Sequence, residues 1–407
     1  MRPLGQTIPF AEALAQALAA VAPIDRTERV RLDEANGRVL AEHIVAGADV
    51  PPFDRAAMDG FAVRAVDTAG ASLRAPQALR CVETIYTGQT PGRAIGPGEC
   101  AEIATGAALP SGADAVVMVE ETDRADSSPP RPTVQIMKPV TPGQNVGPRG
   151  ADIARGESIL APGDHLTPSR VGACAAVGRA DVDVYARPMV TIVSTGGEVV
   201  APGQPLGPAQ IYDINRWTLV SIASLHGGMP KVLPSVRDEL PALQAMIVDA
   251  AGSTDVLVFS GGSSVGEKDL VLDAVRGAGE ILFHGIAIKP GKPTALGRLG
   301  STPVLVMPGN PASCLCNAYL LLVPMLRKMA RLPAHTPRTL ALPLASRIVS
   351  TAGRHQFYTV RVEDGAAVPA FKSSGDITSM SRADGYIEVP AHTGAIEAGE
   401  TVHVSLF

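Results

Sequence analysis

The chain has 407 residues, more than one hydrophobic core usually supports, so about two to four domains are expected. Its composition, 46% hydrophobic and 18% charged, excludes an intrinsically disordered chain. The net charge of −5, without any run of Lys or Arg, argues against general nucleic-acid binding.

The five cysteines give no sign of a zinc site. Only Cys314 and Cys316 are close together, and a C-x-C pair without a second pair is not zinc spacing. Small buried residues in a reducing compartment are expected instead. The sequence has no signal-peptide pattern and no apolar run long enough to span a bilayer, so a cytoplasmic protein without membrane contact is expected.

Helix and turn signals open the chain. Thr7 and Pro9 precede an expected helix with Phe10 and Leu14 on its apolar face. The turn-rich stretch "VPPFDRAAMDGFAV" follows. From about residue 60 to 138, short strands alternate with turns, which predicts a small β-rich domain with an exposed loop or hairpin near its end, in "DRADSSPPRPT".

A run of Gly and Pro turns marks the segment 140–185. It contains a short expected helix with Thr167 as N-cap, Pro168 at the first helical position and Gly178 as the C-terminal stop. No motif repeats at a fixed period, so a solenoid is not expected.

From residue 188 to 330, apolar strands alternate with helical segments. The strands are "MVTIVS", "DVLVFS" and "TPVLVMP". Their continuous apolar character in a βαβ order predicts a doubly wound α/β domain whose parallel sheet is covered on both faces. The remaining sequence returns to short strands, which predicts a second small β domain. Helices are expected at about 214–226, 238–251, 267–277 and 312–330.

Residues that can carry chemistry follow the predicted strands. In an open parallel sheet, ligands bind at the carboxyl ends of the strands, and four expected strands here, the three above and "IAI" (286–288), lead into glycine-rich turns. Each turn alone is equally explained as a tight turn, and each charged residue as a solvated one. Four turns on one edge favour a shared cleft. Its candidate residues are Thr195, Gly196, Glu198, Ser260, Gly261, Gly262, Ser264, Gly266, Asp269, Lys289, Lys292, Pro308, Gly309, Asn310 and Pro311.

The composition of this cleft indicates an anion site. Glycine turns expose backbone N–H groups, and helix N-termini favour an anion. The two lysines of "KPGKP" add positive charge suited to phosphate or another oxyanion, and carboxylates beside a phosphate can hold Mg²⁺. The spacing of "GIAIKPGKP" excludes a P-loop, and "STGGEVV" does not match the dinucleotide-binding fingerprint.

A serine hydrolase is the rival interpretation. "GSSVG" fits the G-x-S-x-G pattern between a strand and a helix, which would make Ser264 a nucleophile. Its histidine would be His335 or His355, and both lie outside the predicted α/β unit. The hydrolase also leaves "KPGKP" and "PGNP" unexplained.

Several sequence blocks together resemble one known family. "PPFDRAAMDGFAV", "ATGAALPSGADAVVMVEET", "GQNVGPRGADI", "SGGSSVGEKD", "IKPGKPTALG" and "VMPGNPAS" resemble, in this order, the molybdopterin molybdenumtransferase family, which includes MoeA and the E domain of gephyrin. The resemblance implies a discontinuous N-terminal domain (1–50 and 140–185), an inserted β-rich domain (51–139), an α/β molybdopterin-binding domain (186–332) and a C-terminal small β-barrel domain (333–407).

The resemblance also implies a reaction. Family members use Mg²⁺ to insert molybdate into adenylylated molybdopterin, release AMP and give molybdenum cofactor. They are homodimers whose active site is shared between subunits, and the molybdopterin adenylyltransferase is a candidate protein partner. A paralogue that handles molybdopterin without inserting metal or inserts tungstate, and a scaffold protein, are the alternatives within this resemblance.

The family motifs imply roles for individual positions. Lys289 and Lys292 would hold molybdate or the terminal phosphate of the pterin, and Ser374 would lie close to the site. The implied Mg²⁺ ligands are Glu198, Asp238 and Asp269. The full implied catalytic set is Asp59, Thr105, Asp238, Asp269, Lys289 and Lys292.

Three positions depart from the family pattern. Gly197 stands where the family usually has Asp, Ser263 where it has Val, and Ala56 where it has Ser. None of these departures removes a matched charged group, although the missing acid at 197 leaves one Mg²⁺ or pterin contact of the family unmatched.

Overall fold

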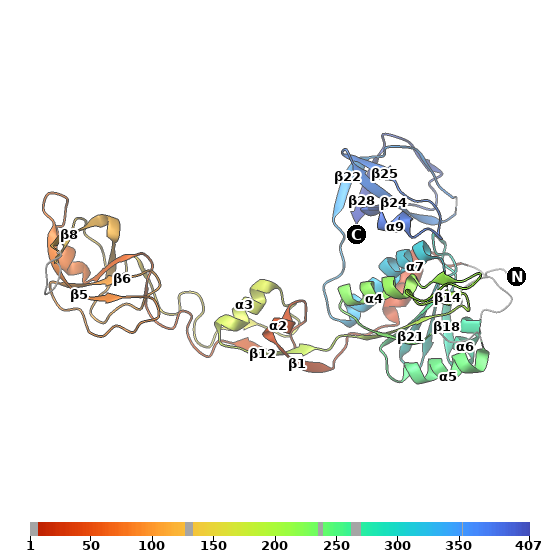
Figure 1. The fold of residues 1–407 in the computed structure, drawn as a ribbon, viewed down its shortest axis with the longest axis horizontal. Coiled ribbons are helices and arrows are strands. Elements are labelled where there is room, and N and C mark those ends of the chain that lie inside the picture. Colours follow the sequence, from red (N-terminus) through yellow and green to blue (C-terminus); the bar gives the residue numbers. More distant parts are fainter. Residues whose placement is uncertain (1–6, 127–132, 235–238, 262–269, 352) are drawn as a thin grey trace. The chain divides into compact units, whose positions relative to one another are not determined.

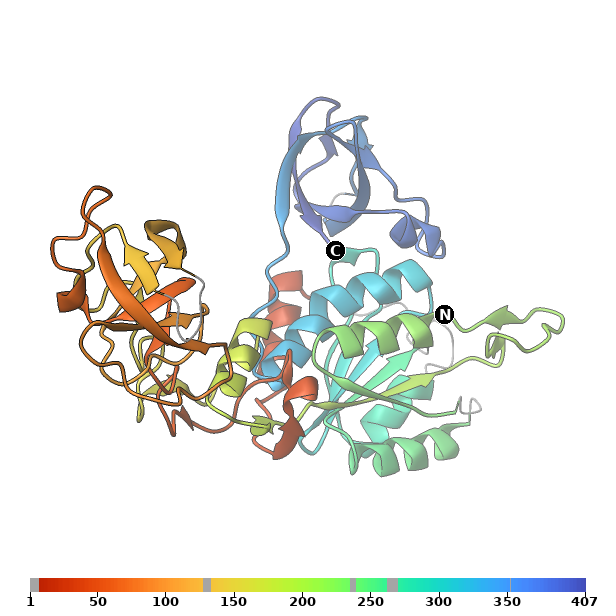
Figure 2. The same ribbon diagram turned by 60° about the vertical axis from the view of Figure 1, so that its left-hand side comes forward.

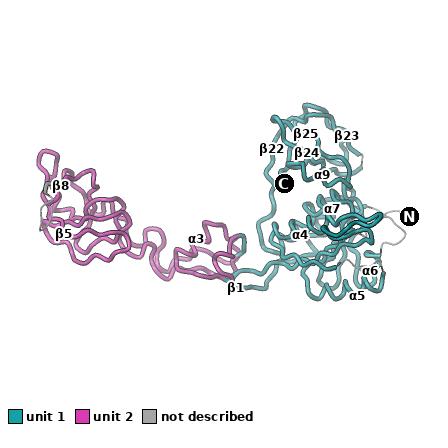
Figure 3. Tube along the Cα trace, in the orientation of Figure 1, with its two compact units in different colours: residues 1–29, 37–39, 183–407 teal, residues 30–36, 40–182 magenta. Residues whose placement is uncertain are grey.

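The structure is a computed structural model that describes residues 7–126, 133–234, 239–261, 270–351 and 353–407. The chain divides into two compact units, which are described separately (Figure 3). Unit 1 contains residues 1–29, 37–39 and 183–407, and unit 2 contains residues 30–36 and 40–182. Two strands carry the chain between the units, β1 (Thr27–Arg31) and β12 (Asp181–Tyr185).

A six-stranded sheet in the order β16-β13-β17-β21-β20-β18 forms the centre of unit 1 (Figure 1). The first four strands are parallel, as predicted for β13, β17 and β21 from their apolar sequences. The sheet is nevertheless mixed, because only Gly300 and Ser301 join β20 to β21 and such a short connection makes an antiparallel hairpin. The strands are β16 (Met229–Val232), β13 (Met189–Ser194), β17 (Val256–Ser260), β21 (Thr302–Met307), β20 (Ala295–Leu299) and β18 (Glu280–His284).

Helices cover both faces of this sheet, which confirms the doubly wound α/β prediction (Figure 2). Ile192 faces the core shared with α1, α4, α7 and α8, whereas the next residue, Val193, faces the core shared with α5 and α6. The helices are α1 (Phe10–Ala19), α4 (Asn215–Leu225), α5 (Leu240–Ala251), α6 (Leu270–Ala278), α7 (Pro311–Asn317) and α8 (Val323–Met329), with the π-helical segment η3 (Ala318–Leu322) between the last two.

The first helix lies with the α/β domain. Ala13 and Ala17 of α1 are fully buried in the core that contains Val190 and Leu326. Residues 10–24, which the family resemblance assigns to the N-terminal domain, therefore pack on the α/β sheet. The remaining boundaries of the four-domain division stay a prediction.

The C-terminal residues form a small β-barrel around Val360, Ile387 and Val404. Its strands follow the order β22-β28-β26-β24, with β25 beside β24, and a bridge from Leu344 to Ala367 of β25 closes the sheet. The elements are β22 (Thr339–Pro343), β23 (Ile348–Val349), β24 (His355–Glu363), β25 (Ala366–Pro369), α9 (Thr378–Ser381), β26 (Gly385–Val389), β27 (Ala395–Ile396) and β28 (Thr401–Leu406).

Unit 2 is rich in strands, as predicted for its central part. One six-stranded sheet has the order β7-β4-β6-β5-β9-β8, and the antiparallel β8–β9 pairing agrees with the hairpin among the two alternatives, hairpin or loop, expected at 123–133. Its strands are β4 (Gly60–Val63), β5 (Gln77–Ile85), β6 (Glu99–Ile103), β7 (Ala115–Met118), β8 (Thr122–Asp126) and β9 (Thr133–Ile136).

The rest of unit 2 consists of short elements, among which helix α3 confirms its sequence signals. The hydroxyl of Thr167 accepts a hydrogen bond from the backbone N–H of Arg170 at 3.4 Å, and Gly178 has a φ of +80°. These elements are α2 (Leu32–Ala35), β2 (Ile44–Val45), β3 (Arg55–Ala56), η1 (Ala65–Thr68), η2 (Val119–Glu121), β10 (Val146–Gly147), β11 (Ser158–Leu160) and α3 (Pro168–Ala176).

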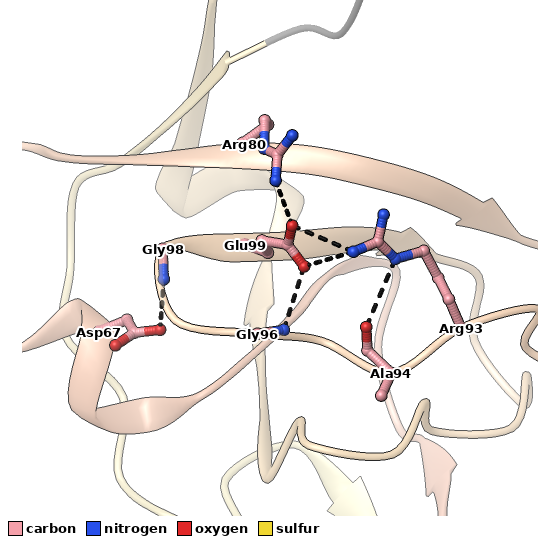
Figure 4. A network of polar contacts seen from close by, with 7 residues as sticks. All are labelled: Asp67, Arg80, Arg93, Ala94, Gly96, Gly98 and Glu99. Carbon is pink, nitrogen blue, oxygen red and sulfur yellow. Dashed lines mark hydrogen bonds and ion pairs between the residues drawn. The ribbon is translucent and has the colours of Figure 1, made fainter.

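A buried carboxylate organises one loop of unit 2 (Figure 4). Glu99 of β6 is 7% exposed and accepts hydrogen bonds from Arg80, Arg93 and the backbone N–H of Gly96. The Gly96 N–H is the main reason that the pKa of Glu99 lies below its usual value. These contacts tie residues 93–98 to the strand pair β5–β6, so we assign the cluster a structural role.

Candidate functional site

Three predicted turns meet at one edge of the α/β sheet. Because β13, β17 and β21 are parallel neighbours, their carboxyl ends lie side by side. The backbone N–H of Thr195 donates to Ser260 O at 3.0 Å, and that of Gly261 donates to Met307 O at 3.0 Å. The pairing therefore continues up to the turns and fixes their relative positions.

Glycine is required where these turns touch. Gly261 has a φ of +92°, and a Cβ at this position would lie 2.9 Å from both the carbonyl and the hydroxyl oxygen of Thr195. A Cβ on Gly309 would lie 3.7 Å from the Cα of Gly261. The turns after β17 and β21 are thus in direct contact, which leaves backbone close to any ligand above them.

Asn215, in the first turn of α4, ties two of these turns together. Its amide nitrogen donates to the Ser260 hydroxyl at 2.7 Å and to the carbonyl of Gly309 at 2.8 Å. Asn215 belongs to no candidate set predicted from the sequence, because an Asn before an apolar helix is usually a cap. Its position in the loop that follows a strand end was the available signal.

The two lysines lie in the loop that joins β18 to β20. This loop follows the carboxyl end of β18. Strand β20 is antiparallel to both β18 and β21, so β18 and β21 run in the same direction. The carboxyl end of β18 therefore lies at the same edge of the sheet as those of β17 and β21. The predicted strand "IAI" is not part of this sheet, since β19 (Ile288–Lys289) pairs with β24 of the barrel. Lys289 and Lys292 are both half-buried.

A network under the lysine loop holds its shape. Gly291, which separates the lysines, has a φ of +106°, and its carbonyl accepts hydrogen bonds from Thr294 Oγ1 at 2.9 Å and from Asn317 Nδ2 at 3.1 Å. Asn317 is fully buried and also contacts the Thr294 hydroxyl. Asn317, the last residue of α7, therefore holds the lysine loop in place through these hydrogen bonds.

The barrel domain contributes two side chains to the same region. Asn310 Nδ2 donates to Ser374 Oγ at 2.9 Å, so Ser374 lies beside the "PGNP" turn. Lys289 Nζ donates to Thr351 Oγ1 at 3.0 Å, a contact that no sequence motif indicated. Pro290 and Ala312 line one small apolar cavity, so the lysine loop and the start of α7 lie close together.

Glu198 is the only one of the three predicted Mg²⁺ ligands that lies within the described residues. Its side chain is exposed, and a Cβ on Gly196 would lie 2.6 Å from its carboxylate, so the carboxylate lies over that turn. The turn leads into the strand pair β14 (Val199–Val200) and β15 (Ile211–Tyr212). Among the described side chains, no cluster of three His, Cys, Asp or Glu groups can hold a metal ion.

A second carboxylate near this turn is already engaged. Asp213 is 5% exposed, accepts a hydrogen bond from the backbone N–H of Arg216 at 3.0 Å and pairs with its guanidinium at 3.0 Å. It stabilises the start of α4 and is not a free ligand for a cation.

Asp59 and Thr105 lie together in unit 2. The Asp59 carboxylate accepts hydrogen bonds from the backbone N–H of Thr105 at 2.7 Å and from its hydroxyl at 2.9 Å. These bonds, the backbone one foremost, lower the pKa of Asp59. Both residues are exposed, so they form a surface pair with a fixed carboxylate.

Several predicted residues lie outside the described part of the chain. They are Asp238, Gly262, Ser263, Ser264, Gly266 and Asp269. Ser264, the nucleophile of the hydrolase interpretation, is one of these residues, so its geometry is not described. Of its candidate histidines, His335 packs against the ring of His226, and His355 stacks on Phe357 and contacts Glu388.

Comparison with known proteins identifies the family. Residues 8–178 match the family described as "MoeA N-terminal region (domain I and II)", residues 191–328 a "Probable molybdopterin binding domain", and residues 341–407 the "MoeA C-terminal region (domain IV)". Molybdopterin molybdenumtransferase 2 of Mycobacterium tuberculosis H37Rv is 34% identical over 385 residues, which cover 92% of this chain and 94% of that protein. The chain belongs to the molybdopterin molybdenumtransferase family.

Other relatives agree with this membership. The molybdopterin molybdenumtransferase of Haemophilus influenzae is 32% identical over 391 residues, with 94% of both chains covered. A crystal structure of the molybdopterin biosynthesis MoeA protein of Pyrococcus horikoshii OT3 aligns over 99% of this chain and 100% of its own, with 31% identity and a TM-score of 0.82. The multidomain α/β fold is therefore the fold of this transferase family.

Proposed function

We propose that this chain inserts molybdate into adenylylated molybdopterin, releases AMP and yields molybdenum cofactor. The observation that carries the proposal is the junction of the turns after β13, β17 and β21, with the lysine loop on the same edge, in a member of this transferase family. Exposed backbone N–H groups and ammonium groups suit a substrate that carries phosphates and a second oxyanion.

The residues divide into those that bind and those that promote cleavage. Breaking a phosphoanhydride depends on neutralising charge and on positioning the nucleophile more than on covalent help from the protein. Lys289 and Lys292 provide positive charge on a fixed loop. We assign Lys292 to molybdate insertion and Asp269 to adenylate hydrolysis, in which water attacks the phosphorus and AMP leaves.

Mg²⁺ is the proposed cofactor. It prefers oxygen ligands and keeps several waters, so one or two carboxylates suffice to hold it. Glu198 fits, because its exposed carboxylate lies over a glycine turn at the sheet edge, and Asp238 and Asp269 are proposed with it. Bound there, Mg²⁺ would neutralise negative charge on the phosphates.

The proposal extends to assembly and location. We propose a homodimer in which Asp59 and Thr105 of one subunit complete the site of the other, and a cytoplasmic enzyme that receives its substrate from the molybdopterin adenylyltransferase. Within the described residues, no helix combines the length and the apolar character needed to cross a bilayer.

The proposal is tested with purified protein, adenylylated molybdopterin, Mg²⁺ and molybdate, measuring AMP and protein-bound molybdenum together. Wild type should release AMP and gain protein-bound molybdenum. Lys292→Ala should lower molybdenum incorporation at least about 10-fold with AMP release retained, whereas Asp269→Ala should abolish AMP release. Lys231→Ala, which removes an exposed lysine of β16, serves as the control.

Three outcomes would contradict the proposal. Equal loss of both steps in both variants removes the division of roles. Tungstate incorporation in place of molybdate identifies a different metal. Labelling of Ser264 by a fluorophosphonate without AMP release favours the hydrolase.

A further inference from the structure

Asn215 is a buried polar residue that sits beneath the candidate site. It is 7% exposed, and both N–H bonds of its amide are used within the protein, one on the Ser260 hydroxyl and one on the Gly309 carbonyl. The two acceptors belong to the ends of β17 and β21. A single side chain on α4 therefore connects three separate elements of the chain.

The hydrogen bonds determine which way the amide faces. A backbone carbonyl only accepts hydrogen bonds, so the amide nitrogen, not the amide oxygen, must face Gly309. The oxygen, Oδ1, is buried and has no hydrogen-bond partner among the described residues. Replacing the nitrogen by an oxygen would therefore remove the connection to Gly309, whereas the Ser260 hydroxyl can turn and donate to the new oxygen.

The connected turns are the ones that form the backbone surface of the site. Gly309 touches Gly261, and Gly261 packs against Thr195, so a shift of one turn displaces its neighbours. Backbone N–H groups bind an anion only when they point to one position, and in catalysis a misplacement of about 1 Å can cost about 100-fold in rate. The amide of Asn215 is thus placed to set the geometry of all three turns.

We propose that Asn215 is a positioning residue for the phosphate-bearing substrate: its amide fixes the turns at Gly261 and Gly309 so that their backbone receives the substrate phosphates. This inference rests on the proposed function. It assigns Asn215 no contact with the reacting atoms. A purely structural polar residue in the same place would instead affect folding and leave substrate binding unchanged.

The test compares kinetics of three variants with wild type. Asn215→Ala should raise the KM for adenylylated molybdopterin about 10- to 100-fold and change kcat less than about 3-fold, because binding geometry is lost and the reacting groups remain. Asn215→Asp, which has nearly the same size but no N–H group, should raise KM at least as much. Ser260→Ala keeps the bond to Gly309 and should raise KM less.

The matched control lies on the same helix. Ser221→Ala removes a hydrogen bond to Trp217 O, nearly two turns along α4 and on an exposed side chain, and should leave KM and kcat unchanged. An unchanged KM in both Asn215 variants, with or without a lower melting temperature, would overturn the inference.

A second readout does not depend on the reaction. Hydrogen exchange measured by mass spectrometry should show faster exchange in Asn215→Asp at peptides that contain Gly261 and Gly309, with unchanged exchange in β22 of the barrel. If wild type releases no AMP, the proposed function fails while this readout still decides whether Asn215 fixes the turns. Unchanged exchange at both turns would overturn that assignment.

Discussion

Gly291 shows how one residue controls the lysine loop. A Cβ at Gly291 would lie 2.2 Å from Nδ2 of Asn317, the group that holds the Gly291 carbonyl. Its φ of +106° also costs a non-glycine residue about 1–3 kcal/mol. Gly291→Ala should therefore lower molybdenum incorporation at least about 10-fold and reduce the melting temperature, as followed by metal analysis and by calorimetry.

Gly300 provides the matched control for this substitution. It also has a positive φ, +56°, but a Cβ added to it would have no atom within 4 Å. Gly300→Ala would strain the backbone through its positive φ, but the new Cβ would contact no other atom. It should therefore reduce the melting temperature and leave molybdenum incorporation unchanged. Normal incorporation by Gly291→Ala would show that the loop tolerates displacement of Asn317.

At the residue scale, motif matching predicted members of the candidate site, among them Gly261, Gly309, Asn310 and Ser374. It did not predict their contacts, because the hydrogen bonds from Asn310 to Ser374 and from Thr105 to Asp59 join segments distant in sequence. Asn215, Asn317 and Thr351 were missed, because they belong to no predicted motif and also act on distant segments. A buried amide and a distant hydroxyl acquire these roles only when the fold brings their partners to them.

At the element scale, local signals predicted the helices better than the strands. Thr167, Pro168 and Gly178 predicted α3 because capping acts within a few residues. The antiparallel β20, with the sequence "ALGRL", was not predicted as a strand, and the predicted strand "IAI" became the two-residue β19 of another sheet, because short or glycine-containing strands depend on their neighbours. Sheet partners from distant sequence decided these two elements.

The end of α4 provides a pH-dependent contact between elements. His226 is 4% exposed and follows α4, and its ring packs edge-on against Tyr319 of η3 and His335 of the segment leading to the barrel, with Arg327 of α8 nearby. Burial, helped by the positive charges of His335 and Arg327, lowers the pKa of His226 to about 4. Protonation of this ring therefore disfavours the folded state.

The direction of the effect follows from the two protonation states. The unfolded chain takes up the proton near pH 6.5 and the folded chain only near pH 4, so the stabilisation is complete above pH 6.5 and is lost as the pH falls to about 4. The loss should be on the order of 1–3 kcal/mol. Urea midpoints between pH 7 and pH 4.5 should fall less in His226→Gln than in wild type.

An exposed histidine tests the specificity of this pH effect. His403 of β28 lies on the surface of the barrel, so His403→Gln should retain the wild-type dependence on pH. Parallel curves for wild type and His226→Gln would assign the acid sensitivity to other groups.

At the scale of the whole molecule, the proposed active site draws on both units. Lys292 belongs to unit 1, and the fixed carboxylate of Asp59 belongs to unit 2. The sequence predicted the β-rich segment and the α/β segment as separate domains, but it did not predict the packing of α1 on the α/β sheet, because partners of Ala13 and Ala17 such as Val190 lie more than 150 residues further along the chain. Assembly is likewise decided by contacts between distant surfaces.

A mixed dimer tests whether the two units of different subunits form one site. Asp59→Ala and Lys292→Ala should each prevent molybdenum incorporation by a homodimer. In the heterodimer, each shared site would combine Asp59 of one subunit with Lys292 of the other. One of the two sites then carries both substitutions, and the second site carries neither. About half of the wild-type molybdenum incorporation should therefore return. Heterodimers isolated through two different affinity tags allow this measurement. If each site were instead built within one subunit, both sites of the heterodimer would carry one substitution and neither would work. Absence of any recovery would therefore place Asp59 and Lys292 in the same subunit's site.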